Sequence, residues 1–151
     1  MSLMSLDVGD LLLEMVPFAR TLGITFDSVG EGRALCRLPD RADLHNHVAG
    51  PHAGALFTLA ESASGAAMLS AFGDQLGRAV PLPTTATIDF RKIATGEVRA
   101  EARLLATKQE VVDRLDAGER PEFGVAVDIK NAEGTLVSAL TVTWTLRPNR
   151  P

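Results

Sequence analysis

The stretch AGALFTLAESASGAAMLSAF, from Ala53 to Phe72, decides the fold of this protein. It contains one charged residue, Glu61, and no proline. A helix that is apolar on all sides must be buried on nearly all sides, and its many Ala, Ser and Gly residues would let a sheet approach its backbone closely. Gly73 and Asp74 supply a stop signal. We therefore expect one long buried helix over this stretch.

Segments on both sides of this helix alternate between apolar and polar residues, as strands do. Residues 23–38 alternate around a glycine-rich turn at 30–32, which predicts a hairpin. Four more strands are predicted in residues 84–95, 97–107, 122–130 and 135–147, the last two joined by a turn at 131–134. Helical spacing predicts a short exposed helix in 108–120, and either one helix bent at Pro17 or two short helices in 8–22.

These elements predict an α+β architecture of about six mostly antiparallel strands wrapped around one long buried helix, which is the hotdog fold. The length of 151 residues fits one domain. We expect a single hotdog domain over residues 4–151, with residues 1–3 as an added leader before a native start at Met4.

Composition excludes several classes of function. The 15 basic and 19 acidic residues give a net charge of −4, and no block of five like charges occurs, which argues against nucleic-acid binding. No apolar run approaches the 18 residues of a membrane span, and the N-terminus lacks the features of a signal peptide, so we expect a cytoplasmic protein. The single cysteine, Cys36, lies in an alternating segment and is interpreted as a buried small hydrophobe rather than a nucleophile.

All three histidines, His45, His47 and His52, lie within eight residues just before the long helix. For each histidine, the alternative to a functional role is a structural role as a turn or cap residue. His45 and His47 on extended backbone would point the same way, toward a metal with His52 or Asp43 as a third ligand. Because no cluster of cysteines or carboxylates accompanies them, we expect no metal site.

Glu61 is the residue that most needs an explanation. A lone carboxylate in an apolar helix costs several kcal/mol to desolvate unless it is paired, protonated or beside a wet cavity, and such sites often have a function. The alternative is a narrow solvated stripe shared with Ser62 and Ser64. His52 precedes Glu61 by nine residues, which predicts opposite sides of the helix. Two antiparallel copies of the helix at a two-fold axis would bring the two together.

The string Asn46-x5-His52-Ala53-Gly54-x6-Glu61 resembles the signature of the PaaI-type hotdog acyl-CoA thioesterases. The usual pattern in that family is Asn, five residues, His-Gly-Gly, six residues, then Asp or Glu. The resemblance implies hydrolysis of an acyl-CoA thioester without a cofactor. It also implies a homodimer or tetramer whose active sites lie between subunits.

The resemblance also implies roles for these positions. Glu61 would be the nucleophile or the general base that activates water. The backbone N–H of Ala53, at the helix start beside Gly54, would stabilise the oxyanion. Asn46 would orient the loop or a water, and His52 would position the thioester. Alanine in place of the usual glycine keeps the backbone donor but narrows the space near the carbonyl.

The expected substrate-binding residues are Leu56, Phe57, Thr84, Thr85 and Phe90, with Met68 as a further candidate for the acyl pocket. Coenzyme A phosphates would need local positive charge, for which the candidates are Arg91, Lys92, Arg147 and Arg150, although solvated charges at strand ends are the simpler interpretation. The sequence leaves open the acyl group and whether coenzyme A or an acyl carrier protein carries it. The alternative function is a noncatalytic hotdog module that binds an acyl chain or acyl-CoA, which Ala53 in place of glycine favours. A hotdog dehydratase would need a catalytic histidine paired with an acidic residue in a different local pattern.

Overall fold

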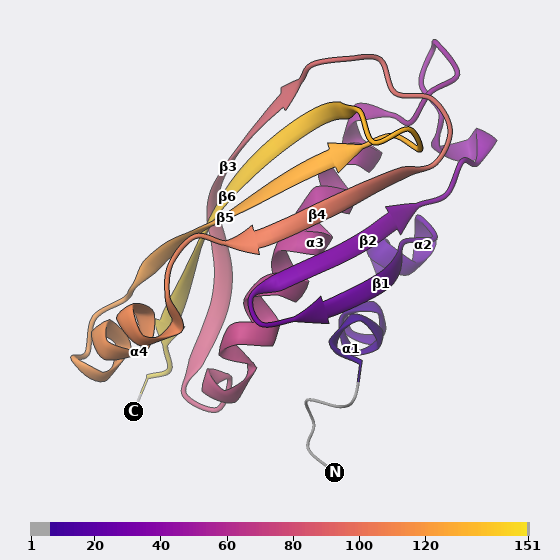
Figure 1. The fold of residues 1–151 in the computed structure, drawn as a ribbon. Coiled ribbons are helices and arrows are strands. Elements are labelled where there is room, and N and C mark those ends of the chain that lie inside the picture. The colour runs from indigo at the N-terminus through magenta and orange to yellow at the C-terminus, as the bar shows by residue number, and fades with distance from the viewer. Residues whose placement is uncertain (1–6, 151) are drawn as a thin grey trace.

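A six-stranded antiparallel sheet curves around one long helix in the computed structural model, which describes residues 7–150 (Figure 1). The expected leader at residues 1–3 lies outside the described residues. The sheet order is β1-β2-β4-β5-β6-β3. The strands are β1 (Thr25–Gly30), β2 (Arg33–Leu38), β3 (Ala79–Phe90), β4 (Val98–Leu104), β5 (Glu122–Lys130) and β6 (Leu136–Pro148). The predicted α+β hotdog architecture is confirmed.

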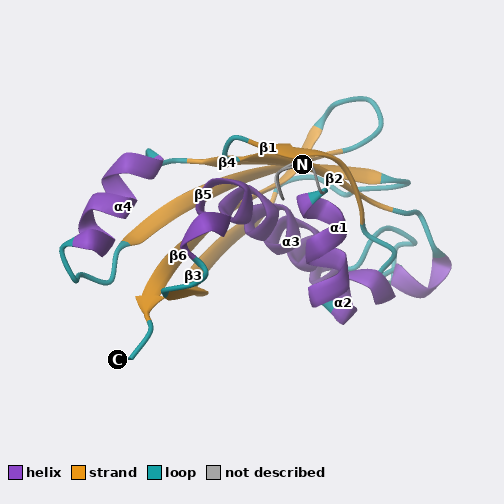
Figure 2. Cartoon of the chain, turned by 90° about the horizontal axis from the view of Figure 1, so that it is seen from below, coloured by secondary structure: helices purple, strands orange, loops and turns teal. Residues whose placement is uncertain are grey.

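Helix α3 (Ala53–Phe72) has the predicted boundaries and lies on the concave side of the sheet (Figure 2). Its alanines at 60, 63, 66 and 67 are fully buried, so the backbone can approach β2, β4 and β5 closely. Contrary to the expectation that no apolar run approaches the length of a membrane span, the segment Ala53–Gln75 is long and apolar enough to cross a membrane by length and hydropathy, a test that the core helix of a soluble protein also passes. Most of it is buried against the rest of the chain.

Two serines of α3 join the helix to the sheet by hydrogen bonds. The indole Nε1 of Trp144 on β6 donates to Ser64 Oγ at 3.1 Å. The backbone N–H of Gly32, in the turn between β1 and β2, donates to Ser70 Oγ at 2.9 Å. Because both bonds are buried, they hold the helix at a fixed position along the sheet.

The other helices lie where the spacing predicts them. Of the predicted alternatives around Pro17, the chain adopts two short helices, α1 (Val8–Met15) and α2 (Pro17–Thr21), which lie beside α3. Helix α4 (Lys108–Asp116) begins with a capping box made by Thr107 and Glu110. Short 3₁₀ turns occupy Ala42–Leu44 and Gly73–Gln75.

Strand β3 differs from its prediction, because it begins at Ala79 rather than at 84 and ends at Phe90 rather than at 95. Pro81 and Pro83 suggested a connection before the strand, yet both lie within it and pair with residues of β6. Proline is tolerated there because β3 is the last strand of the sheet and pairs only with β6. Residues 83–87 are all exposed, so this edge strand is open to solvent on both faces.

Cys36 on β2 is fully buried, as predicted for a small core residue. Burial raises the pKa of its thiol well above the ordinary value. The thiolate, which is the nucleophilic form, is therefore suppressed.

Candidate functional site

Glu61 lies near the middle of α3 and is half-buried. Its carboxyl group borders a cavity of about 200 Å³, whose other walls include Leu12 and Val16 at the N-terminus and Trp144 on β6. Among residues 7–150, no side chain forms a salt bridge with Glu61, and none donates a hydrogen bond to its carboxylate. Burial raises the pKa of Glu61 above its ordinary value. An unpaired carboxylate in apolar surroundings is destabilising, so its presence indicates a functional group.

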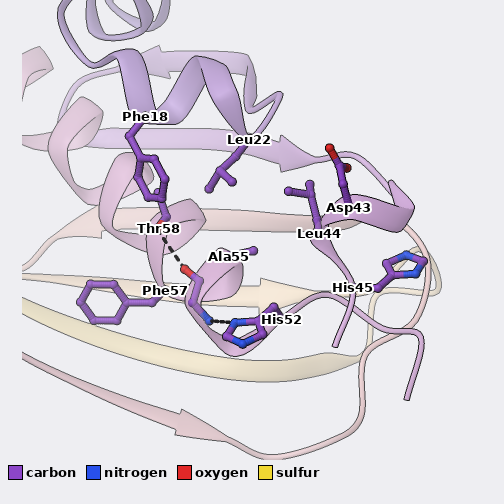
Figure 3. Close-up of a pocket in the computed structure, with 10 residues that line it drawn as sticks. Phe18, Leu22, Asp43, Leu44, His45, His52, Ala55, Phe57 and Thr58 are labelled. Atoms are coloured by element: carbon purple, nitrogen blue, oxygen red, sulfur yellow. Dashed lines mark hydrogen bonds between the residues drawn. The ribbon is translucent and has the colours of Figure 1, made fainter. Parts of the chain in front are cut away.

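The N-terminus of α3 presents a backbone donor that nothing in the described chain uses. His52 is the N-cap, and its Nδ1 accepts a hydrogen bond from the N–H of Gly54 at 2.8 Å (Figure 3). An accepting Nδ1 carries no proton, so in the neutral ring the proton is on Nε2. The N–H of Ala53 has no acceptor among residues 7–150, and Ala53 is exposed. This N–H belongs to the positive end of the helix dipole and can bind a negatively charged oxygen.

Asn46 organises the loop that leads into α3. Its Oδ1 accepts hydrogen bonds from the N–H groups of Val48 and Gly50, at 3.0 and 3.1 Å. A Cβ atom at Gly50 would collide with the carbonyl oxygen of Ala94, so only glycine fits this approach. Asn46 therefore holds the loop in a tight turn.

The remaining histidines do not form a metal site with their neighbours. The ring Nε2 of His45 lies 2.7 Å from Asp40 Oδ1. His47 is exposed and lines a different cavity from His45 and His52. In the described part of the chain, no group of three or more His, Cys, Asp or Glu side chains is placed to hold a metal ion.

The predicted substrate residues are divided among separate surfaces. Leu56 and Phe90 line a cavity of about 390 Å³ together with Asn46, Ala53, Arg91 and Lys92. Phe57 lines a cavity of about 520 Å³ with His52 and Gly54, and there Phe18 of α2 points toward Thr58 (Figure 3). Met68 lines the cavity beside Glu61. Thr84 and Thr85 lie on the exposed edge strand, and Arg147 and Arg150 line a hollow at the far end of β6.

The separation of His52 from Glu61 has a different cause from the predicted one. The prediction of opposite sides of one helix treated His52 as helical, but it precedes α3 and has extended backbone. Gly54, Phe57, Thr58 and Glu61 follow helical spacing and are all exposed or half-buried, so they share one side. Ala53 and Glu61 are eight residues apart, about 12 Å along the axis. One chain alone therefore does not bring the carboxylate to the free N–H.

The model of the family described as "Domain of unknown function (DUF4442)" matches residues 8–146. The chain belongs to this family. None of the curated proteins matches the sequence. Several solved structures are similar to this DUF4442 chain, and two PaaI proteins among them share its hotdog fold.

One similar structure is that of PA5026 from Pseudomonas aeruginosa, a protein of unknown function described as a probable thioesterase. It is 29% identical, the alignment covers 94% of each chain, and the TM-score is 0.84. The conserved protein PA5202 from Pseudomonas aeruginosa is 27% identical over 87% of this chain and 94% of the other, with a TM-score of 0.71. The PaaI protein of the Escherichia coli phenylacetic acid degradation operon is 22% identical over 91% and 88%, with a TM-score of 0.72. The resemblance inferred from the sequence is thereby confirmed, and the chain has a thioesterase-like hotdog fold.

The site also contains residues that the sequence analysis missed. Leu12, Met15 and Val16 close the cavity beside Glu61, and Gly65 lies in its wall. The i, i+4 spacing of Glu61 and Gly65 was a signal that could have placed these two together. Nothing in the local pattern of the first helix indicated that it would cover α3 at this point.

Proposed function

We propose that this protein hydrolyses the thioester bond of an acyl-CoA. The observation that carries the proposal is the Glu61 carboxyl group, which lies unpaired in an apolar cavity on the same helix as the free Ala53 N–H. Its place in the string from Asn46 to Glu61 and the similarity to a probable thioesterase support the same activity.

In the proposed reaction, ionised Glu61 takes a proton from water while the water oxygen forms a bond to the thioester carbon. The carbonyl oxygen becomes negatively charged, and the Ala53 N–H and the α3 dipole stabilise it. Collapse of this intermediate breaks the carbon–sulfur bond, and the leaving thiolate takes the proton that Glu61 removed from water, which returns Glu61 to its ionised form. Direct attack by Glu61 on the carbonyl carbon would instead break the carbon–sulfur bond, release the thiolate and give an acyl-enzyme anhydride, and water would then hydrolyse the anhydride to the acid and free Glu61.

The two groups would come from two subunits. Strand β3 is a long edge strand, and its second half, from Thr84 to Phe90, contains no proline, so it can pair with a copy of itself. A two-fold axis makes such pairing antiparallel and lays the two α3 helices side by side. When Ala53 of one subunit faces Glu61 of the other, symmetry places Phe57, the midpoint, opposite its own copy. Phe57 is 36% exposed, in agreement with a contact at the axis.

The cavity beside Ala53 would hold the coenzyme A end of the substrate. It joins the helix N-terminus to Arg91 and Lys92, which supply positive charge for phosphate groups. Neither side chain forms a salt bridge within the described chain. Arg147 and Arg150 lie at the opposite end of β6 in the same subunit, so antiparallel β3 pairing would carry the partner's copies toward this cavity.

Release of free thiol from a panel of acyl-CoA and acyl carrier protein thioesters tests the function and identifies the carrier. Hydrolysis is expected for at least one acyl-CoA. If the protein binds acyl-CoA in a one-to-one ratio without releasing thiol, it is the noncatalytic binding module instead.

The rate of hydrolysis should fall as the pH falls, because Glu61 must be ionised to act as base or nucleophile. Burial raises the pKa of Glu61, so the loss should begin above pH 4.5, the ordinary value of the group. A pH profile of kcat/KM for the wild type and for Glu61→Gln measures this. A fall of the same shape in the variant would assign the titration to another group.

A further inference from the structure

The cavity beside Glu61 is lined mostly by apolar side chains. We propose that it receives the acyl group of the substrate, that the acyl group is uncharged and apolar, and that Gly65 sets its size. This inference rests on the proposed thioesterase function, since it assigns the acyl part of the same site.

The chemistry of the walls restricts the acyl group. Helix α1 contributes Leu12 and Met15, α3 contributes Met68, and β6 contributes the face of Trp144. Among residues 7–150, no lysine, arginine or histidine lines this cavity, and Glu61 is the one charged residue that does. A second carboxylate on the acyl chain would be repelled by ionised Glu61 in surroundings with little water. An apolar chain would gain the free energy of leaving water.

The volume gives the size of the group. The cavity measures about 200 Å³. An engineered apolar cavity of about 150 Å³ in another protein binds benzene, so this one has room for about six to eight carbon atoms. The exposed side chain of Met15 lies at its rim, where the flexible thioether can adapt to different chains.

Gly65 lies one helical turn after Glu61 and forms part of the cavity wall. A Cβ atom at this position would lie 3.5 Å from Leu12 Cδ1 and 3.7 Å from Trp144 Cζ2, which is ordinary contact. A methyl group therefore fits, whereas a larger side chain would extend into the space between α1 and β6. Glycine in the middle of a helix makes the helix less stable than alanine at the same position would. The absence of a side chain at Gly65 thus leaves room for a ligand and lowers the stability of α3.

Trp144 offers a probe of this cavity that needs no turnover. It is the one tryptophan of the chain, and it lines the cavity. Its fluorescence should change when an alkyl group replaces solvent beside the ring. Coenzyme A thioethers with S-alkyl chains of two to twelve carbons resist hydrolysis and carry such groups.

Titration of the wild type with these thioethers should show affinity rising to a chain of about six to eight carbons and then levelling or falling. In Gly65→Val the optimum should move to shorter chains, with about tenfold or greater loss of affinity for the longest chain that the wild type binds well. Ethyl-CoA should bind both proteins equally. Gly73→Val is the matched control, because a Cβ atom at Gly73 meets no atom within 4 Å.

Two results would overturn the inference: the same chain-length dependence in Gly65→Val as in Gly73→Val, or no change in Trp144 fluorescence at saturation. If Gly65→Val does not fold, Gly65→Ala adds one methyl group and should move the optimum in the same direction by a smaller amount. Chain-length-dependent binding without hydrolysis of any acyl-CoA would contradict the proposed function and leave the acyl cavity established.

Discussion

Glu61→Gln should lower the rate of thioester hydrolysis by about 10²–10⁴-fold, the usual contribution of a general base. Glutamine has the same size and can keep the shape of the cavity, but it neither accepts a proton from water nor attacks the thioester carbon. Substrate binding should change little, so the loss should appear in kcat. Steady-state kinetics on the best substrate of the acyl-CoA panel measure both parameters.

The stability of this variant separates lost chemistry from lost structure. The pKa of Glu61 is raised in the folded protein, so its protonated form favours folding below the unfolded pKa, and that contribution is lost as the pH rises through the folded pKa. At neutral pH the unpaired carboxylate therefore opposes folding, and Glu61→Gln should have a Tm equal to or above that of the wild type. Glu61→Asp keeps a carboxylate and should retain much more activity. Full activity in Glu61→Gln would remove this residue from the mechanism.

Ala53→Pro should reduce the rate by about 10²–10³-fold while leaving the fold intact, because it deletes a single backbone donor from the proposed oxyanion site. Ala53 is the first residue of α3, where proline is well tolerated because that N–H makes no bond within a helix. The preceding residue, His52, already has φ −62° and ψ 145°, the extended conformation that a following proline requires. The far-ultraviolet circular dichroism spectrum and the Tm should match the wild type.

The matched control at this position is Ala53→Gly, which keeps the N–H and restores the residue usual in the resembling family. Its rate on the best substrate should stay within a few-fold of the wild type, and it should accept bulkier groups near the carbonyl. Equal activity of the proline and glycine variants would show that the Ala53 N–H does not bind the developing charge.

Much of the fold could be predicted because α3 and the last two strands have strong patterns. The segment from Ala53 to Phe72 is followed by a stop signal at Gly73 and Asp74, which marks the end of the helix. Its single charged residue, Glu61, indicated a functional position. Strand β5 alternates regularly between buried and less buried residues, and β6 does so from Ser138 to Trp144. The same patterns identified Glu61 as the residue most in need of an explanation, and the structure leaves its carboxylate unpaired in an apolar cavity.

Features that depend on tertiary neighbours could not be predicted in the same way. Proline is rarely found inside a strand. Pro81 and Pro83 are tolerated within β3 because β3 is an edge strand. The prediction that His52 and Glu61 project from opposite sides of one helix was wrong because His52 precedes α3 with extended backbone, so helical spacing does not apply to it. Leu12 of α1 lines the same cavity as Gly65, although the two residues are more than 50 positions apart in the sequence. Local periodicity does not report such a contact.

In the proposed dimer, each active site takes Glu61 from one subunit and the Ala53 N–H from the other. Mixing the two inactive variants, Glu61→Gln and Ala53→Pro, after joint refolding or co-expression tests this claim most directly. In a random mixture about half of the dimers are hybrids, and each hybrid has one intact site of two, so about one quarter of wild-type activity should return. If native mass spectrometry shows the hybrids and no activity returns, the two groups do not act in a shared site.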